Sequence, residues 1–75
     1  MSKSAKIKSL LVLRDKSTKD LATHLGITEQ ALRNKYNRDS FSTDDLIKIA
    51  QFVDCELCLI SDDVKVSFTD EDMKQ

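Results

Sequence analysis

Residues 17–37 read STKDLATHLGITEQALRNKYN, and this stretch decides the fold. It opens with Ser17 and, three residues later, Asp20, which is the pattern of a capping box at the start of a helix. Gly26 fits the left-handed residue that ends a helix. Thr28, two positions later, is a favourable N-cap for a second helix. The stretch therefore predicts two helices joined by a short turn.

The apolar residues of this stretch predict how the two helices pack. Ala22 lies four residues before Gly26, where a larger side chain would push the helices apart. Ile27 and Leu32 flank the start of the second helix as a hydrophobic staple, which fixes the angle at which it leaves the turn. The wedge between the helices is expected to be filled by Leu21, Leu25, Ile27 and Leu32. Together these features form a helix-turn-helix pattern.

The sequence on either side predicts one further helix each. Upstream, apolar residues recur at spacings of three and four, which is typical of a one-sided helix over roughly residues 4–15. The expected inward positions there are Ile7, Leu10, Leu11 and Leu13. Downstream, Ser42 and Asp45 repeat the capping-box pattern, with Phe41 and Leu46 as a second staple. A fourth helix is therefore predicted over about residues 43–53.

Beyond Asp54 the pattern changes to short runs rich in β-formers, at residues 55–60 and 64–68. Residues 61–63 separate the runs, so we expect a β-hairpin with a three-residue loop. The acidic tail, residues 69–75, is expected to fray. The predicted fold is thus mostly α: a four-helix domain over residues 1–54, followed by a small C-terminal β-hairpin over residues 55–68 that belongs to the same domain.

Length and composition agree with this fold. The chain has 75 residues, which suits one domain, and its single glycine and absence of proline favour helices with few irregular loops. No apolar run approaches the ~20 residues that cross a bilayer, and no signal peptide is evident. The two cysteines do not suggest a disulfide framework, so we expect a cytoplasmic protein without contact to a membrane.

Charge is distributed unevenly along the chain. Residues 1–38 carry nine basic and three acidic side chains, a net charge of +6, whereas residues 39–75 carry three and ten, a net charge of −7. Such an asymmetry is expected when one half meets phosphates and the other has a different role. Ordinary solvated charge is the alternative explanation.

In its helix-turn-helix pattern and the helices on either side, the chain resembles the phage repressor and Cro-type helix-turn-helix family, also called the XRE family. The resemblance covers about residues 5–54 and is carried by residues 17–25, 26–32 and 41–53. It implies a repressor-like, sequence-specific DNA-binding regulator of transcription. One departure is Lys35, nine positions after the glycine, where many members have an aliphatic residue. We expect Tyr36 to complete the buried stripe with Leu32, leaving Lys35 free to meet a phosphate.

In that family the third helix, here about residues 29–37, enters the major groove and its first residues touch base edges. Carried over by position, the base-reading candidates are Glu29, Gln30, Arg33 and Asn34. Arginine pairs with guanine, glutamine and asparagine with adenine, and glutamate accepts from cytosine. Solvated surface is the alternative for these residues. For Glu29 the alternative is stabilisation by the helix dipole.

Phosphate contacts are expected from polar residues at the helix starts and after the third helix. These candidates are Thr18, Lys19, Thr28, Lys35, Asn37, Arg38 and Ser40. Capping alone is the alternative for Thr28.

No set of residues suggests catalysis, and we expect neither an enzyme, nor a cofactor, nor a small-molecule ligand. Cys55 and Cys58 have metal-site spacing, but only His24 could join them, short of the four ligands of structural zinc. We therefore expect structural cysteines, a solvated histidine and no metal site.

The C-terminal half carries more apolar surface than so small a domain can cover. We therefore expect a homodimer on double-stranded DNA, assembled through Ile47, Phe52, Leu57, Leu59, Ile60, Val64, Val66 and Phe68. The alternative is a monomer whose hairpin folds back over its own helices. A different alternative for the function is a protein-protein interaction module, such as an antitoxin-like partner.

Overall fold

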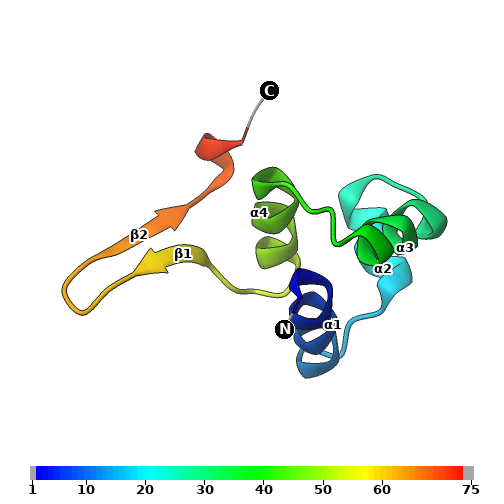
Figure 1. Ribbon diagram of the computed structural model, residues 1–75, viewed down its shortest axis with the longest axis horizontal. Coiled ribbons are helices and arrows are strands. Elements are labelled where there is room, and N and C mark those ends of the chain that lie inside the picture. Colours follow the sequence, from blue (N-terminus) through cyan, green and yellow to red (C-terminus); the bar gives the residue numbers. More distant parts are fainter. Residues whose placement is uncertain (1, 74–75) are drawn as a thin grey trace.

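The computed structural model describes residues 2–73. Their elements in chain order are α1 (Lys3–Leu13), α2 (Thr18–Leu25), α3 (Glu29–Arg38), α4 (Thr43–Phe52), β1 (Leu57–Ile60), β2 (Lys65–Phe68) and the 3₁₀ turn η1 (Asp70–Asp72). The four helices gather at one end, and the hairpin projects away from them (Figure 1). The predicted mostly-α fold of four helices and a C-terminal hairpin is confirmed.

Each of the four helices begins at a residue with a side-chain hydroxyl. The hydroxyl oxygens of Ser2, Ser17, Thr28 and Ser42 each accept the backbone N–H of the third helical residue. At Ser42 the Asp45 carboxylate also accepts the Ser42 N–H, which completes a capping box. Gly26 ends α2 in the left-handed conformation, with φ of 73°. Side chains that satisfy otherwise unpaired N–H groups therefore fix where these helices start. This was predicted for Ser17, Thr28 and Ser42, and the cap at Ser2 was not predicted.

Asp39 ends α3 and also holds the start of α1. Its backbone is left-handed, with φ of 53°, a conformation that aspartate tolerates better than most residues. Its carboxylate accepts the Ser4 N–H at 2.8 Å. The Ser4 Oγ lies 2.8 Å from the same carboxylate and 2.8 Å from the Tyr36 carbonyl oxygen. The Ser4 N–H, followed by its hydroxyl, lowers the pKa of Asp39 below its ordinary value of 3.8.

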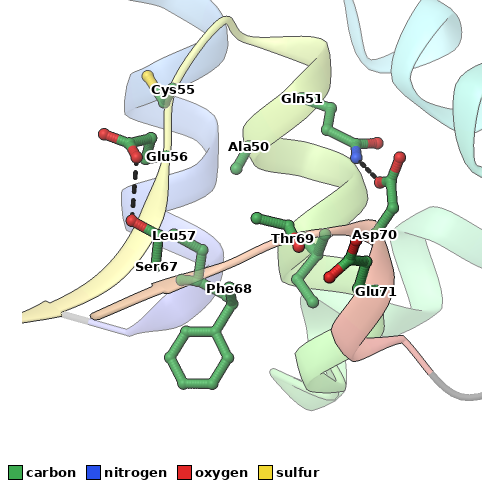
Figure 2. Close-up of a pocket in the computed structure, with 11 residues that line it drawn as sticks. Ala50, Gln51, Cys55, Glu56, Leu57, Ser67, Phe68, Thr69, Asp70 and Glu71 are labelled. Carbon is green, nitrogen blue, oxygen red and sulfur yellow. Dashed lines mark hydrogen bonds between the residues drawn. The ribbon is translucent and has the colours of Figure 1, made fainter.

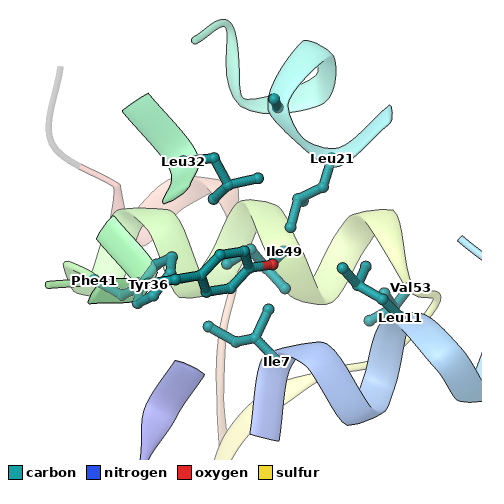
Figure 3. Close-up of a cluster of buried hydrophobic side chains, with 9 residues drawn as sticks. Ile7, Leu11, Leu21, Leu32, Tyr36, Phe41, Ile49 and Val53 are labelled. Atoms are coloured by element: carbon teal, nitrogen blue, oxygen red, sulfur yellow. The ribbon is translucent and has the colours of Figure 1, made fainter. Parts of the chain in front are cut away.

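The core lies between the four helices (Figure 3). Its buried members are Ile7, Leu11, Leu21, Ala22, Leu32, Tyr36, Phe41, Ile49 and Val53. Tyr36 fills the position predicted for it, and its ring centroid lies 5.6 Å from that of Phe41. Leu13 was expected to face inward, and that expectation was wrong, since it is 77% exposed. Leu13 follows buried Leu11 by two residues, which is about half a helical turn, so the two side chains point to opposite sides of α1.

The hairpin is shorter than predicted at the start of each strand. The Cys55 N–H donates to the Ala50 carbonyl at 2.8 Å, so the chain is still turning out of α4 where the first strand was expected. At the other end, the Ser61 N–H donates to the Val64 carbonyl at 2.8 Å. This bond closes the turn, and the assigned strand β2 begins only after it, at Lys65.

The two faces of the hairpin differ in chemistry. Leu57 pairs with Phe68 and Leu59 with Val66, so all four side chains lie on one face. Toward the tip this face is open to solvent, with Leu59 66% and Val66 52% exposed. We call Leu57, Leu59, Val66 and Phe68, together with Val64 as the next residue in the alternation, the apolar hairpin face. The opposite face carries Ile60 beside Lys65, and Cys58 beside Ser67.

The base of the hairpin lies against α4 of its own chain. A groove of about 390 Å³ between α4, the hairpin and η1 is lined in part by Ile47, Ala50, Leu57 and Phe68 (Figure 2). Ile47 was expected at a dimer interface, but it is only 1% exposed, and this expectation is corrected. The second apolar side of α4 is covered within the chain, which leaves Ile47 no surface to offer a partner.

Phe52 and the tail also make contacts within the chain. The Phe52 ring is half-buried, and its centroid lies 5.1 Å from that of His24. The tail was expected to fray, yet it forms η1, and the Gln51 side chain donates to the Asp70 carboxylate. Residues 74–75 of that tail lie outside the described residues. Among residues 2–73, no helix is long and apolar enough to cross a bilayer.

Candidate nucleic-acid interface

The turn between α2 and α3 sets the orientation of α3. It consists of Gly26, Ile27 and Thr28, and the Ile27 N–H donates back to the Ala22 carbonyl at 3.0 Å. The Thr28 Oγ1 then accepts the Ala31 N–H at 3.0 Å and starts α3. Since α2 packs against both α3 and α4, the turn holds α3 with one side on the core and the other in solvent.

The two sides of α3 have opposite character. Leu32 and Tyr36 are the buried positions. The exposed positions are all polar: Gln30, Arg33, Asn34, Asn37 and Arg38. We call these five residues, with the half-buried Glu29 at the first turn, the α3 surface. It offers amide and guanidinium groups on successive turns, which are the groups that hydrogen-bond to base edges and phosphates.

The structure brings the four candidates for base reading together as two pairs. The Arg33 Nη2 donates to the Glu29 Oε2 at 3.2 Å. The Gln30 Nε2 donates to the Asn34 Oδ1 at 3.2 Å. The two residues of each pair are four positions apart in the sequence, so they lie on the same side of the helix. The side chains therefore share a surface and already have partners in the absence of DNA.

The phosphate candidates fall into two groups. Four of them are exposed: Lys19 on α2, Asn37 and Arg38 on the α3 surface, and Ser40 just after α3. Thr18 is half-buried at the start of α2. Burial raises the pKa of Tyr36, and the Thr18 side chain has a smaller, opposite effect on that pKa. Thr28 is exposed, but its hydroxyl oxygen is already used as the N-cap of α3.

Lys35 is not free to meet a phosphate, contrary to our expectation. Its Nζ lies 3.0 Å from the Asp45 Oδ2, and both side chains are largely buried. The same oxygen accepts the Ser42 N–H at 3.1 Å. Burial acts to raise the pKa of Asp45, but the hydrogen bonds from Ser42 and Lys35 outweigh it and lower the pKa from 3.8. Lys35 thus ties the end of α3 to the start of α4.

His24, Cys55 and Cys58 are the residues whose types and spacing came nearest to a metal site in the sequence. The His24 Nε2 lies 3.0 Å from the Lys48 carbonyl oxygen. Cys55 and Cys58, expected as buried structural cysteines, are free thiols and are half-buried. Within residues 2–73, no three His, Cys, Asp or Glu side chains are grouped so as to hold a metal ion.

Sequence reasoning missed the contacts of two carboxylates that position the α3 surface. Asp39, at the end of α3, bonds to Ser4 of α1. Asp45 was predicted as a capping-box residue of α4, but its bond to Lys35 of α3 was not. Asp39 gave one signal: an aspartate directly after a predicted helix is a residue type that accepts the left-handed end position. Its partner could not be identified without the fold.

Comparison with family models shows which family the chain belongs to. The model of the bacteriophage CI repressor helix-turn-helix domain matches residues 7–61. This range contains all of α2, α3 and α4 and reaches through β1. No curated protein and no solved structure matches the chain.

Proposed function

Because the chain belongs to the bacteriophage CI repressor helix-turn-helix family, we propose that it regulates transcription by inserting α3 into the major groove of an operator. The family is one of DNA-binding repressor domains rather than of enzymes. We expect the protein in the cytoplasm, where its DNA target would be.

The observation that carries this proposal is the composition of the α3 surface. Its exposed side chains are Gln30, Arg33 and Asn34 on the first two turns, followed by Asn37 and Arg38 at the end of the helix. Arg33 is suited to guanine O6 and N7, and Gln30 and Asn34 are suited to adenine. A helix held on a core by Leu32 and Tyr36, with such groups outward, has the form of a recognition helix.

Phosphate contacts in this proposal come from Lys19 at the start of α2, and from Asn37, Arg38 and Ser40 around the end of α3. Thr28 and Thr18 lie at helix starts, where backbone N–H groups also favour an anion. Lys35 is left out because Asp45 already holds its ammonium group. The basic N-terminal half faces DNA, and the acidic C-terminal half remains away from it.

The test begins with selection of preferred duplexes from random DNA. Arg33→Ala is expected to cost about 1–3 kcal/mol on the selected duplex and to relax the preference at one base pair. Arg38→Ala is the matched control, since it removes the same side chain from the same helix. It should weaken selected and random duplexes alike and reduce the salt slope by about one for each bound copy of the chain. Equal losses on both duplexes for Arg33→Ala would show that Arg33 does not read a base.

We further propose that the protein binds DNA as a homodimer through the apolar hairpin face. One recognition helix offers a few base contacts at ~1–3 kcal/mol each, whereas specific complexes typically reach 10⁻⁸ M or tighter. A second copy on the apolar hairpin face would cover Leu59, Val64 and Val66, which are more than half exposed. Two α3 helices about 34 Å apart would then match one turn of DNA.

The hairpin geometry narrows the residues that this interface uses. Ile60 is 73% exposed, but it lies beside Lys65 on the face opposite Leu59. The Lys65 ammonium there is 2.5 Å from the Glu56 carboxylate, so that face is partly charged. We therefore leave Ile60 and the buried Ile47 out of the interface. Half-buried Leu57 and Phe68 lie at its inner edge. Phe52 is left out as well, because its ring packs beside His24 on the helical side of the molecule.

A further inference from the structure

The Arg33–Glu29 pair places a negative charge on a surface that is expected to meet phosphates. Glu29 is the acidic residue within α3, and its carboxylate lies 3.2 Å from the Arg33 guanidinium. The Glu29 side chain is 38% exposed and the Arg33 side chain is 60% exposed. A carboxylate on such a surface repels the phosphates of any DNA, so its presence calls for a reason other than non-specific affinity.

Helix stability does not supply that reason in full. An exposed pair of this spacing stabilises a helix by only about 0.3–0.5 kcal/mol. The helix already starts at a good N-cap, since Thr28 holds the Ala31 N–H. The pair matters more for what it does to Arg33, because that guanidinium is a group that could bind either a base or any passing phosphate.

We propose that Glu29 is a specificity-determining residue that acts through Arg33. This inference rests on the proposed DNA-binding function. The guanidinium has five N–H donors, and the contact to Glu29 uses Nη2. The remaining donors can reach guanine O6 and N7 while Glu29 fixes the plane of the group. Away from a matching base, the same carboxylate neutralises Arg33 and withholds its charge from phosphates.

This arrangement lowers non-specific binding more than specific binding. A cation that binds a phosphate adds about −0.9 to the slope of log K against log salt. Because Glu29 neutralises Arg33, random DNA does not gain affinity from a contact between Arg33 and a phosphate. A guanine at the right position gains affinity from a bidentate contact with Arg33 instead. Glu29 would therefore be a positioning residue that raises the ratio of specific to non-specific affinity.

The experiment compares two duplexes, one selected from random DNA and one scrambled, over a range of salt concentrations. Glu29→Gln keeps the length of the side chain and removes its charge. Glu29→Asp keeps the charge in the first turn but shortens the reach to Arg33. Both variants are expected to bind the scrambled duplex about three- to tenfold more tightly, with a slope steeper by about 0.9 for each bound copy of the chain. The selected duplex should change by less than about twofold, so the specificity ratio falls.

Two controls distinguish an effect of the Glu29–Arg33 contact from the general effect of removing a negative charge. Asp20→Asn removes a negative charge from the first turn of α2, and it should strengthen both duplexes about equally. In an Arg33→Ala background, Glu29→Gln should leave the specificity ratio unchanged. Circular dichroism of each variant checks that the helices are intact.

Equal strengthening of both duplexes by Glu29→Gln, as for Asp20→Asn, would overturn the inference. The inference would also be overturned if Glu29→Asp bound both duplexes as the unaltered chain does. The same holds if Glu29→Gln lowered the specificity ratio equally in the Arg33→Ala background. A new preference at one base pair would instead make Glu29 a direct base reader. If the unaltered chain binds neither duplex, the proposed function itself fails, which is a distinguishable result.

Discussion

Tyr36 carries a buried polar group that the core does not satisfy. Its side chain is packed among Ile7, Leu32 and Ile49 (Figure 3). Within the described residues, its hydroxyl makes no hydrogen bond of normal length. Burial raises the pKa of Tyr36, against a smaller opposite effect of the Thr18 side chain. The hydroxyl is therefore present at a cost to stability.

Replacing Tyr36 with phenylalanine is expected to stabilise the fold. The ring would still pack against Phe41 and beneath the Lys8 ammonium, which lies 4.8 Å from the ring centroid. Loss of the unsatisfied hydroxyl should raise the free energy of unfolding by about 0.5–1 kcal/mol, at the lower end of what such a group costs. Urea denaturation of both proteins measures this. A less stable Tyr36→Phe variant would mean that the hydroxyl has a partner after all.

At the residue scale, the sequence predicted which side chains point outward on α3 but not what they touch. The positions of Leu32 and Tyr36 follow from a four-residue spacing, and the structure confirms both as buried. Lys35 was predicted to be free because Leu32 and Tyr36 complete the buried stripe of its helix without it. Its partner Asp45 is ten residues away, and only the packing of α4 brings it near.

At the scale of elements, the helix starts were predictable and the contacts between elements were not. A start depends on one hydroxyl and an N–H three residues later, so sequence alone identifies it. The hairpin was placed too early because Cys55 continues the turn out of α4. The bond from Ser4 to Asp39 joins residues 35 positions apart, which no local pattern indicates.

That bond makes stability depend on pH. The pKa of Asp39 is lowered below 3.8, first by the Ser4 N–H and then by its hydroxyl. The charged carboxylate is thus favoured in the folded state, so its contribution is complete above the unfolded pKa and is lost as pH falls through the folded pKa. We expect the free energy of unfolding to decrease from about pH 5 to pH 2.

The matched variant is Asp39→Asn, which cannot ionise. Its free energy of unfolding should change less over the same range, with the remaining slope due to other carboxylates such as Asp45, whose pKa is also lowered. Urea titrations at several pH values compare the two chains. Parallel pH profiles would rule out Asp39 as a source of the acid sensitivity.

At the scale of the whole molecule, the fold class followed from the order of patterns, whereas the fate of the apolar surplus did not. Ile47 and Leu59 look alike in the sequence, yet Ile47 is buried against the chain's own hairpin and Leu59 remains 66% exposed. The difference depends on where the hairpin leaves α4. The structure thus divides the surplus into a part covered within the chain and a part still open.

The open part predicts self-association. Leu59→Glu places a charge on the apolar hairpin face and is expected to convert a dimer to a monomer. Ile60→Glu makes the same change one residue away, on the opposite face, and should leave the dimer intact. Light scattering at micromolar concentration measures both. A monomeric mass for the unaltered chain, free and on DNA, would reject the dimer, and equal effects of the two variants would reject this face.

The claim on which the rest depends is that the α3 surface binds DNA. The most direct measurement is the salt dependence of binding to a duplex selected from random DNA. Two copies, each using Lys19 and Arg38, neutralise about four phosphates, so log K should fall with log salt at a slope of about −3.6 or steeper. Failure to select any duplex, or a slope near zero, would contradict it and favour a protein-protein interaction module instead.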